Sequence, residues 1–258
     1  MHTAPSLSSN DVTHLHAFCL FTGYPQSGHS LVGALLDAHP DAVIAHAADV
    51  LDLVRTDITR EELFATLIEN SRAAAETGRM QTGYSYAVEG SWQGRARSLR
   101  VIGDKAGAKT TRGLIKEPDA LEAVERLVGL PLRLIHVIRN PFDNVASIRL
   151  IKEQKTMPRS AASFGRLANE NARVLALGRP VLTVRHEDLV ADPKRELRRL
   201  CEFLDLPPED DYLETAASLV FSSPRRTREK VEWAPETIAA VEDVIAAHDF
   251  FAGYTYEN

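Results

Sequence analysis

The sequence predicts one three-layer α/β/α domain over residues 17–258, with a central parallel sheet and a mostly helical C-terminal third. Short apolar runs recur along the chain, and most are followed by a turn and then by residues with helical periodicity, as in doubly wound α/β folds. One run, residues 132–138, is almost continuously apolar, as expected for a strand buried on both faces of a parallel sheet. With 258 residues and 44% apolar side chains, the chain can bury one large core.

The first predicted unit is a strand, a loop and a helix over residues 18–38. An apolar run at residues 17–22 ends at Gly23, and leucines then recur at helical spacing until a His-Pro pair stops them at residues 39–40. A strand followed directly by a glycine-containing loop and a helix is a common anion-binding unit.

The remaining elements continue the alternation of strands and helices. Further strands are predicted at residues 41–45, 99–102, 132–138 and 181–184, and helices at residues 60–76, 119–127, from 140 onward and 193–204. Asn140 and Pro141 supply an N-cap residue and a proline at the first helical position. Residues 77–99 are rich in glycine and aromatic residues, so we interpret them as a surface loop that forms a lid or an acceptor wall.

Composition limits the possible settings and partners. The formal net charge is −6, which counts against a general nucleic-acid-binding surface. Any anion site must therefore be a local group of arginines. The two cysteines form neither a disulfide framework nor a zinc-site pattern. Because no apolar stretch approaches the roughly 20 residues that span a bilayer, we expect no membrane span, a cytoplasmic protein, and a disordered polar tail at residues 1–16.

Residues 23–30 read GYPQSGHS, which has the spacing of a Walker phosphate loop, G-x-x-x-x-G-K-[ST], with His29 at the lysine position. Glycines let backbone N–H groups turn toward an anion, and the following helix adds the positive end of its dipole. The missing lysine normally contacts the outer phosphates of a triphosphate, which counts against ATP or GTP. The alternative interpretation is an ordinary glycine turn.

A second candidate anion site follows the buried strand at residues 132–138. The strand ends on Arg139, and the next helix carries Ser147 about two turns later. Ligands bind at the carboxyl ends of parallel strands, where a guanidinium can pair with a phosphate and a hydroxyl can satisfy a further oxygen. The alternative is a structural salt bridge at Arg139 and a solvent-facing Ser147.

Together these segments resemble the donor-binding signatures of the sulfotransferase family that uses 3′-phosphoadenosine 5′-phosphosulfate (PAPS). The resemblance is carried by residues 24–31, YPQSGHSL, and residues 139–147, RNPFDNVAS. Support comes from residues 184–189, VRHEDL, which resemble the family's Arg-Tyr-Glu-Asp-Leu segment with histidine in place of tyrosine. The likeness extends from about residue 18 to residue 256 and is nearer to bacterial members.

The resemblance implies a P-loop-type nucleoside-phosphate-binding fold and transfer of a sulfuryl group from PAPS to a hydroxyl or amine of a small-molecule acceptor, without a metal. It assigns the 5′-phosphosulfate to Gln26, Ser27, Gly28, His29 and Ser30, and the 3′-phosphate, which stays on the product PAP, to Arg139 and Ser147. A basic segment at residues 222–230 resembles the one that closes over the 3′-phosphate, which adds Arg226 and Arg228 as donor contacts.

The loop departs from the family at Gln26, where lysine or arginine is usual, so part of the expected catalytic charge is missing. Lys105 resembles a family residue near the reaction centre and could supply that charge, while His29 at a helix N-terminus is better suited to donate a neutral hydrogen bond. His46, after the second strand, is the first choice for general base, ahead of Asp49 and Asp104.

Two other readings remain open at this point. A P-loop kinase would use the strand end at Asp104 to bind magnesium, but the histidine at position 29 counts against it. A PAPS- or PAP-binding homologue impaired in catalysis is suggested by Gln26.

Overall fold

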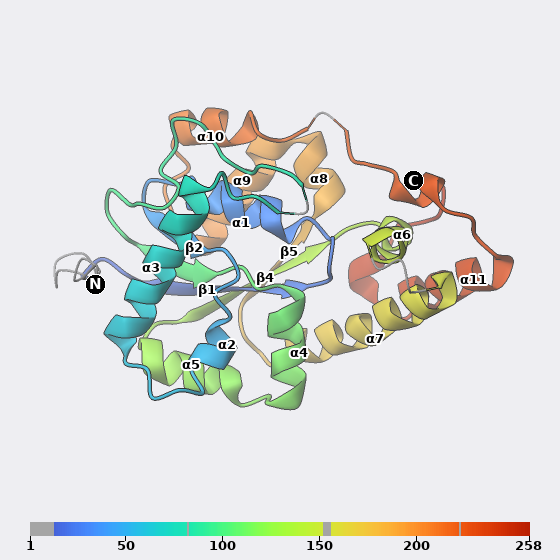
Figure 1. Cartoon of the computed structure of the whole chain (residues 1–258), viewed down its shortest axis with the longest axis horizontal. Coiled ribbons are helices and arrows are strands. Elements are labelled where there is room, and N and C mark those ends of the chain that lie inside the picture. The colour runs from blue at the N-terminus through green and yellow to red at the C-terminus, as the bar shows by residue number, and fades with distance from the viewer. Residues whose placement is uncertain (1–12, 82, 152–155, 222) are drawn as a thin grey trace.

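The computed structural model describes residues 13–81, 83–151, 156–221 and 223–258. Within these residues, a five-stranded parallel sheet has the order β2-β3-β1-β4-β5 (Figure 1). The strands are β1 (Ala17–Gly23), β2 (Ala42–Ala45), β3 (Val101–Asp104), β4 (Leu132–Ile138) and β5 (Val181–Arg185). Because β1 lies between β3 and β4, the segments that leave these three strands meet at one edge of the sheet, which is where α/β proteins bind ligands.

Helices cover both faces of this sheet (Figure 1). One face carries α1 (His29–Asp37), α8 (His186–Ala191), α9 (Pro193–Leu204) and α10 (Asp210–Ala217). The other carries α2 (Val50–Leu53), α3 (Arg60–Glu76), α4 (Ala108–Lys116) and α5 (Ala120–Val128). The three-layer α/β/α arrangement predicted from the sequence is therefore confirmed.

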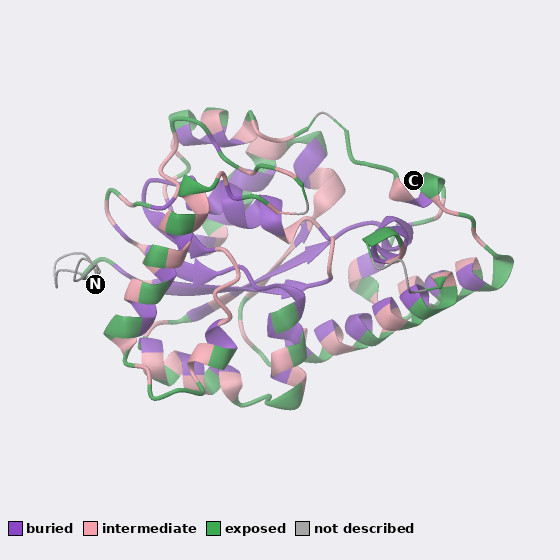
Figure 2. Cartoon of the chain, viewed as in Figure 1, coloured by how far each residue is buried: buried purple, intermediate pink, exposed green. Residues whose placement is uncertain are grey.

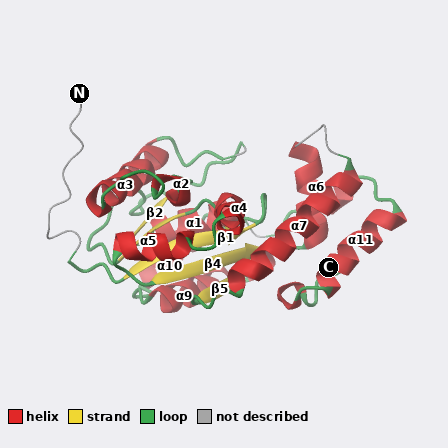
Figure 3. Ribbon diagram, turned by 90° about the horizontal axis from the view of Figure 1, so that it is seen from below, coloured by secondary structure: helices red, strands yellow, loops and turns green. Residues whose placement is uncertain are grey.

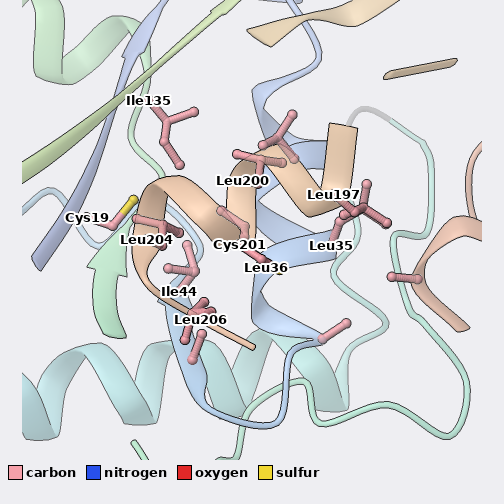
Figure 4. Packing of buried hydrophobic residues seen from close by; sticks show 14 of the residues in the cluster. Cys19, Leu35, Leu36, Ile44, Ile135, Leu197, Leu200, Cys201, Leu204 and Leu206 are labelled. Atoms are coloured by element: carbon pink, nitrogen blue, oxygen red, sulfur yellow. The ribbon is translucent and has the colours of Figure 1, made fainter. Parts of the chain in front are cut away.

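Side chains of β1 show how the sheet holds these two layers together. Alternate residues point to opposite faces, so Cys19 and Phe21 pack with α1 and α9, while Phe18 stacks on Phe64 of α3 with ring centroids 6.4 Å apart. Figure 4 shows the first of these clusters, in which leucines of α1 and α9 meet over the sheet. Each fully buried leucine contributes about 1.5–3 kcal/mol, and Figure 2 shows the buried residues concentrated on the sheet and the inner helix faces.

A third group of helices lies beyond the carboxyl ends of the strands, at the right of Figures 1 and 3. It contains α6 (Pro141–Ile151), α7 (Met157–Leu175), α11 (Pro235–Ala246) and the short 3₁₀ helices η1 (Thr227–Lys230) and η2 (Asp249–Phe251). Tyr24, at the start of the phosphate loop, is fully buried in this group, with its ring 4.9 Å from that of Phe164. The group thus anchors both the loop and the C-terminal segment.

The sequence prediction located all five strands but not all helices. The third strand runs from Val101 to Asp104, two residues later than predicted, and the helices α2, α4, α7 and α8 were not predicted. Most of the predicted tail lies outside the described residues, but within its described part Leu15 is buried and His16 Nε2 lies 3.0 Å from the Leu204 carbonyl. No helix among the described residues is both long and apolar enough to cross a membrane.

Candidate active site

A cavity of about 600 Å³ opens at the carboxyl edge of the sheet. Its walls come from the phosphate loop, the described part of loop 77–99, the N-terminal half of α4, residues of α6 and α8, and the C-terminal segment before η1. Of the residues predicted for the site, the cavity is lined by Gln26, Gly28, His29, Ser30, Arg139 and Ser147. The fold therefore brings both halves of the predicted donor site to one cavity.

The phosphate loop has a conformation that exposes backbone N–H groups. Gln26 and Gly28 both have positive φ, 66° and 96°, and Gly28 is the N-cap of α1 with no side-chain cap. The Ser27 hydroxyl donates a hydrogen bond to the Tyr24 carbonyl at 3.0 Å, and the Asn144 side chain of α6 donates to the Pro25 carbonyl. These bonds fix the loop against α6 and leave the N-terminus of α1 open toward the cavity.

His29 is neutral at this helix end. Burial, reinforced by the charge of Lys105, lowers its pKa to about 3. Its Nδ1 lies 3.4 Å from Ser27 Oγ, and its ring packs on Gly107, where a methyl group would lie 3.0 Å from His29 Cδ2. A neutral imidazole at this position offers hydrogen bonds to an anion without adding charge.

Lys105 is a buried cation beside the phosphate loop, and it contacts the loop through Ser30 although it is not among the residues that line the cavity. It follows β3, is 3% exposed, and its Nζ donates a hydrogen bond to Ser30 Oγ at 3.3 Å. Its stem crosses Gly33 of α1, where a methyl group would lie 2.8 Å from Lys105 Cγ, so the glycine makes room for it. Burial lowers the pKa of Lys105 to about 8, which leaves it charged at neutral pH.

Asp104 and His46 lie next to Lys105, but their side chains are engaged with residues outside the phosphate loop. The Asp104 carboxylate accepts the backbone N–H groups of residues 48–50 at 2.9–3.2 Å, and so holds the start of α2. His46 Nε2 lies 3.0 Å from Gln81 Oε1, and Gln81, not His46, lines the cavity. Burial lowers the pKa of His46 to about 4.

Arg139 and Ser147 meet at the opposite wall. Both are almost buried, at 8% and 7% exposed, and both hydrogen-bond to Thr227 Oγ1, at 2.9 Å from Arg139 and 3.1 Å from Ser147. Arg139 also donates to the Arg225 carbonyl, while its Nε has no hydrogen-bond partner among the described residues. A guanidinium and two hydroxyls suit a phosphate group.

The C-terminal basic segment contributes different residues from those predicted. Arg228 pairs with Asp143 at 3.0 Å and donates to the Tyr256 carbonyl, whereas Arg226 is exposed and reaches the Glu257 carbonyl. Neither lines the cavity, but Arg225 and Thr227 do. The segment's first residue, Ser222, lies outside the described residues.

Loop 77–99 approaches the basic segment across the cavity. The Arg225 guanidinium lies 4.3 Å from the centre of the Tyr84 ring, which is a cation–π contact. Tyr84, Tyr86 and Gln81 line the cavity, whereas Val88 of the same loop is buried and Trp92 hydrogen-bonds through its backbone to the Ala38 carbonyl. The loop is a cavity wall on one side and packs on the core with the other.

Sequence reasoning missed His186 as a cavity residue. Its imidazole lies against the phosphate loop, where a methyl group on Gly28 would approach Nδ1 to 2.5 Å. Nδ1 is buried without a hydrogen-bond partner among the described residues, and burial, aided by the charge of Arg139, lowers the pKa of His186 to about 4. The available signal was its place in the VRHEDL segment. Lys109 and Arg112 of the unpredicted α4 also line the cavity.

No group of three or more histidine, cysteine, aspartate or glutamate side chains among the described residues is arranged to hold a metal ion. A parallel sheet with a glycine-containing phosphate loop at its switch point defines a P-loop-type α/β protein. The chain belongs to the sulfotransferase family, whose model matches residues 20–211. That assignment confirms the resemblance seen in the sequence.

Solved structures with this fold include sulfotransferases from bacteria and mammals. The sulfotransferase domain of the Synechococcus PCC 7002 olefin synthase is 18% identical, with a TM-score of 0.51 over 93% of this chain and 98% of that one. Mouse sulfotransferase SULT7A1, solved in complex with PAP, is 13% identical, with a TM-score of 0.52 over 93% and 90% of the two chains. No curated protein matches the sequence.

Proposed function

We propose that this protein transfers a sulfuryl group from PAPS to a small-molecule acceptor. The observation that carries the proposal is the convergence of the phosphate loop and the Arg139–Ser147–Thr227 group on one cavity. By the sequence resemblance, the loop is assigned the 5′-phosphosulfate and the second group the 3′-phosphate. The PAP complex of a protein with the same fold supports a nucleotide of this kind as the ligand. We assign no donor contact to Arg226 or Arg228, because their guanidinium groups are directed to the Glu257 carbonyl and to Asp143.

Catalysis requires stabilisation of the charge that develops on the leaving phosphate oxygen. The bond between sulfur and that oxygen breaks as a bond forms between sulfur and the acceptor oxygen or nitrogen, and the acceptor loses its proton. We assign charge stabilisation to Lys105 and the N-terminus of α1, with hydrogen bonds from Gln26 and Ser30. Ser27, whose hydroxyl donates to the Tyr24 carbonyl, holds the loop in shape instead. Lys105 thereby replaces the basic residue that position 26 lacks.

For proton transfer we propose His29 ahead of His46, because His29 lines the cavity and His46 lies behind Gln81. An anionic donor beside His29 would raise its pKa from the low value set by burial, so the imidazole can accept a proton as the acceptor reacts. We expect His29→Ala to lower kcat by about 100-fold and His46→Ala by less than about tenfold. Single-turnover rates of the two variants check this, and equal losses would contradict it.

The pH profile tests the role of Lys105. Its pKa is lowered to about 8, so its charge, and with it the donor kcat/KM, should fall as pH rises through that value. In Lys105→Arg the cation persists, and the fall should be absent up to about pH 10. Lys116→Arg, on an exposed residue of α4, is the matched control and should retain the wild-type profile. Persistence of the fall in Lys105→Arg would rule out Lys105 as its source.

The activity itself is tested with ³⁵S-labelled PAPS against phenols, alcohols and amines. Transfer of label to any acceptor, with loss of this transfer in Lys105→Ala, supports the proposed sulfotransferase activity. Binding of PAP without transfer to any acceptor supports the alternative of an impaired homologue, which the glutamine at position 26 favours. Gln26→Lys separates the two further, since a large rate gain would identify missing charge as the deficit.

A further inference from the structure

The cavity has no acidic side chain. Aspartate and glutamate outnumber lysine and arginine in this chain by 36 to 30, yet the described lining contains no carboxylate. Its charged residues are all cations: Lys109, Arg112, Arg139 and Arg225. Arg139 belongs to the proposed donor site, and the Arg225 guanidinium is stacked on Tyr84. Two cations of α4 are therefore left without a role in donor binding.

These two cations lie near the reacting end of the proposed donor. The first turn of α4 follows Lys105 and packs through Gly107 on the His29 ring. Lys109 and Arg112 are three residues apart and so project from the same side of the helix. Lys109 makes one exposed contact with Asp49 at 3.4 Å, and Arg112 is exposed with no ion pair to any described residue. Both are available to a ligand anion.

Apolar side chains gather beside these cations at the cavity. Large exposed apolar side chains are few among the described residues, and three of the five line this cavity: Leu150, Ile151 and Phe221, at 41%, 52% and 60% exposed. Tyr84 and Tyr86 extend the apolar surface inward. Single exposed apolar side chains are ordinary on protein surfaces, but a group of them around a cavity indicates a binding surface.

We propose that the acceptor is a hydroxyl on a largely apolar molecule that also carries an anionic group, and that Arg112 and Lys109 bind this group. The inference rests on the proposed sulfuryl transfer and specifies its acceptor class. An ammonium acceptor would meet cations and no counter-charge, whereas a carboxylate or phosphate would pair with the α4 cations. The proposal therefore narrows the acceptor group from a hydroxyl or an amine to a hydroxyl.

Three molecules with one skeleton test the proposal: ω-hydroxyoctanoate, octanol and ω-aminooctanol. We expect ω-hydroxyoctanoate to have a KM roughly five- to tenfold lower than octanol, and ω-aminooctanol to be the poorest acceptor. Arg112→Glu should abolish or reverse this order. Lys116→Glu makes the same charge change on the same helix outside the cavity and should leave the order intact.

Binding measurements keep this test separate from the proposed function. Calorimetric titration measures the affinity of the protein for ω-hydroxyoctanoate and for octanol, with and without PAP. This measurement needs no turnover. Tighter binding of the carboxylate, lost in Arg112→Glu but not in Lys116→Glu, supports the acceptor site even where PAP fails to bind. Equal binding of the two, or tighter binding of octanol, overturns the acceptor proposal even where PAP binds as expected.

Discussion

Arg139→Ala is expected to weaken PAP binding by about 100-fold or more, while binding of adenosine 5′-monophosphate changes little. Arg139 is 8% exposed, so its removal takes a partly desolvated, charge-assisted contact from the 3′-phosphate, worth roughly 3 kcal/mol. Adenosine 5′-monophosphate lacks that phosphate and serves as the internal control. Calorimetry of both nucleotides on wild type and variant measures the difference.

Arg226→Ala is the matched control, because Arg226 is an arginine of the neighbouring basic segment whose side chain is directed to Glu229 and the Glu257 carbonyl. It should leave PAP affinity within about twofold of wild type. Asp143 keeps its pair with Arg228 when Arg139 is removed, so we expect the variant to fold. Ser147→Ala, a smaller change, should weaken PAP binding by about tenfold. An equal loss for both nucleotides would contradict the 3′-phosphate assignment.

Arg79→Ala is expected to lower the free energy of unfolding by about 3–5 kcal/mol, the cost of leaving a buried charge unpaired. The Arg79 and Asp37 side chains are both fully buried and approach to 2.5 Å. Asp37 also accepts hydrogen bonds from Ser71, the Ile44 backbone and the Gly94 backbone. The pair thereby ties α1, α3, β2 and loop 77–99 together.

Urea titration followed by circular dichroism measures this loss. Arg126→Ala removes an exposed pair with Glu122 on α5, with both side chains more than half exposed, and should cost under about 1 kcal/mol. Because Gly94 and Arg79 belong to loop 77–99, we also expect faster proteolysis of that loop in Arg79→Ala. Similar stability changes in the two variants would show that the buried network does not stabilise the fold.

The sheet could be predicted because its strands are apolar runs with clear ends, but some elements have no such pattern. Asp104 reads as a turn residue, yet it ends β3 because backbone N–H groups of residues 48–50 satisfy its carboxylate. Helix α4 contains two threonines and a glycine and so has weak helical propensity. It forms where Thr111 Oγ1 accepts the Gly23 N–H at 3.1 Å, a contact between distant segments.

The loop and the arginine–serine pair were predictable because their residues are close in sequence and their spacing has a physical meaning. Which residues of the basic segment face the cavity could not be predicted, because this depends on Asp143, which pairs with Arg228 across 85 positions. That pairing turns Arg228 away and leaves Arg225 and Thr227 at the cavity. Similarly, only the fold shows that Lys105 reaches Ser30 and that Gln81 separates His46 from the cavity.

The most direct test of the account is calorimetric titration of the wild-type protein with PAP in the presence of a chelator and, separately, with ATP and magnesium. The two-part donor site predicts metal-independent PAP binding in the micromolar range or tighter, and ATP binding at least about tenfold weaker, because ATP lacks the 3′-phosphate that Arg139 and Ser147 are assigned to hold. Magnesium-dependent ATP binding with no detectable binding of PAP would contradict it.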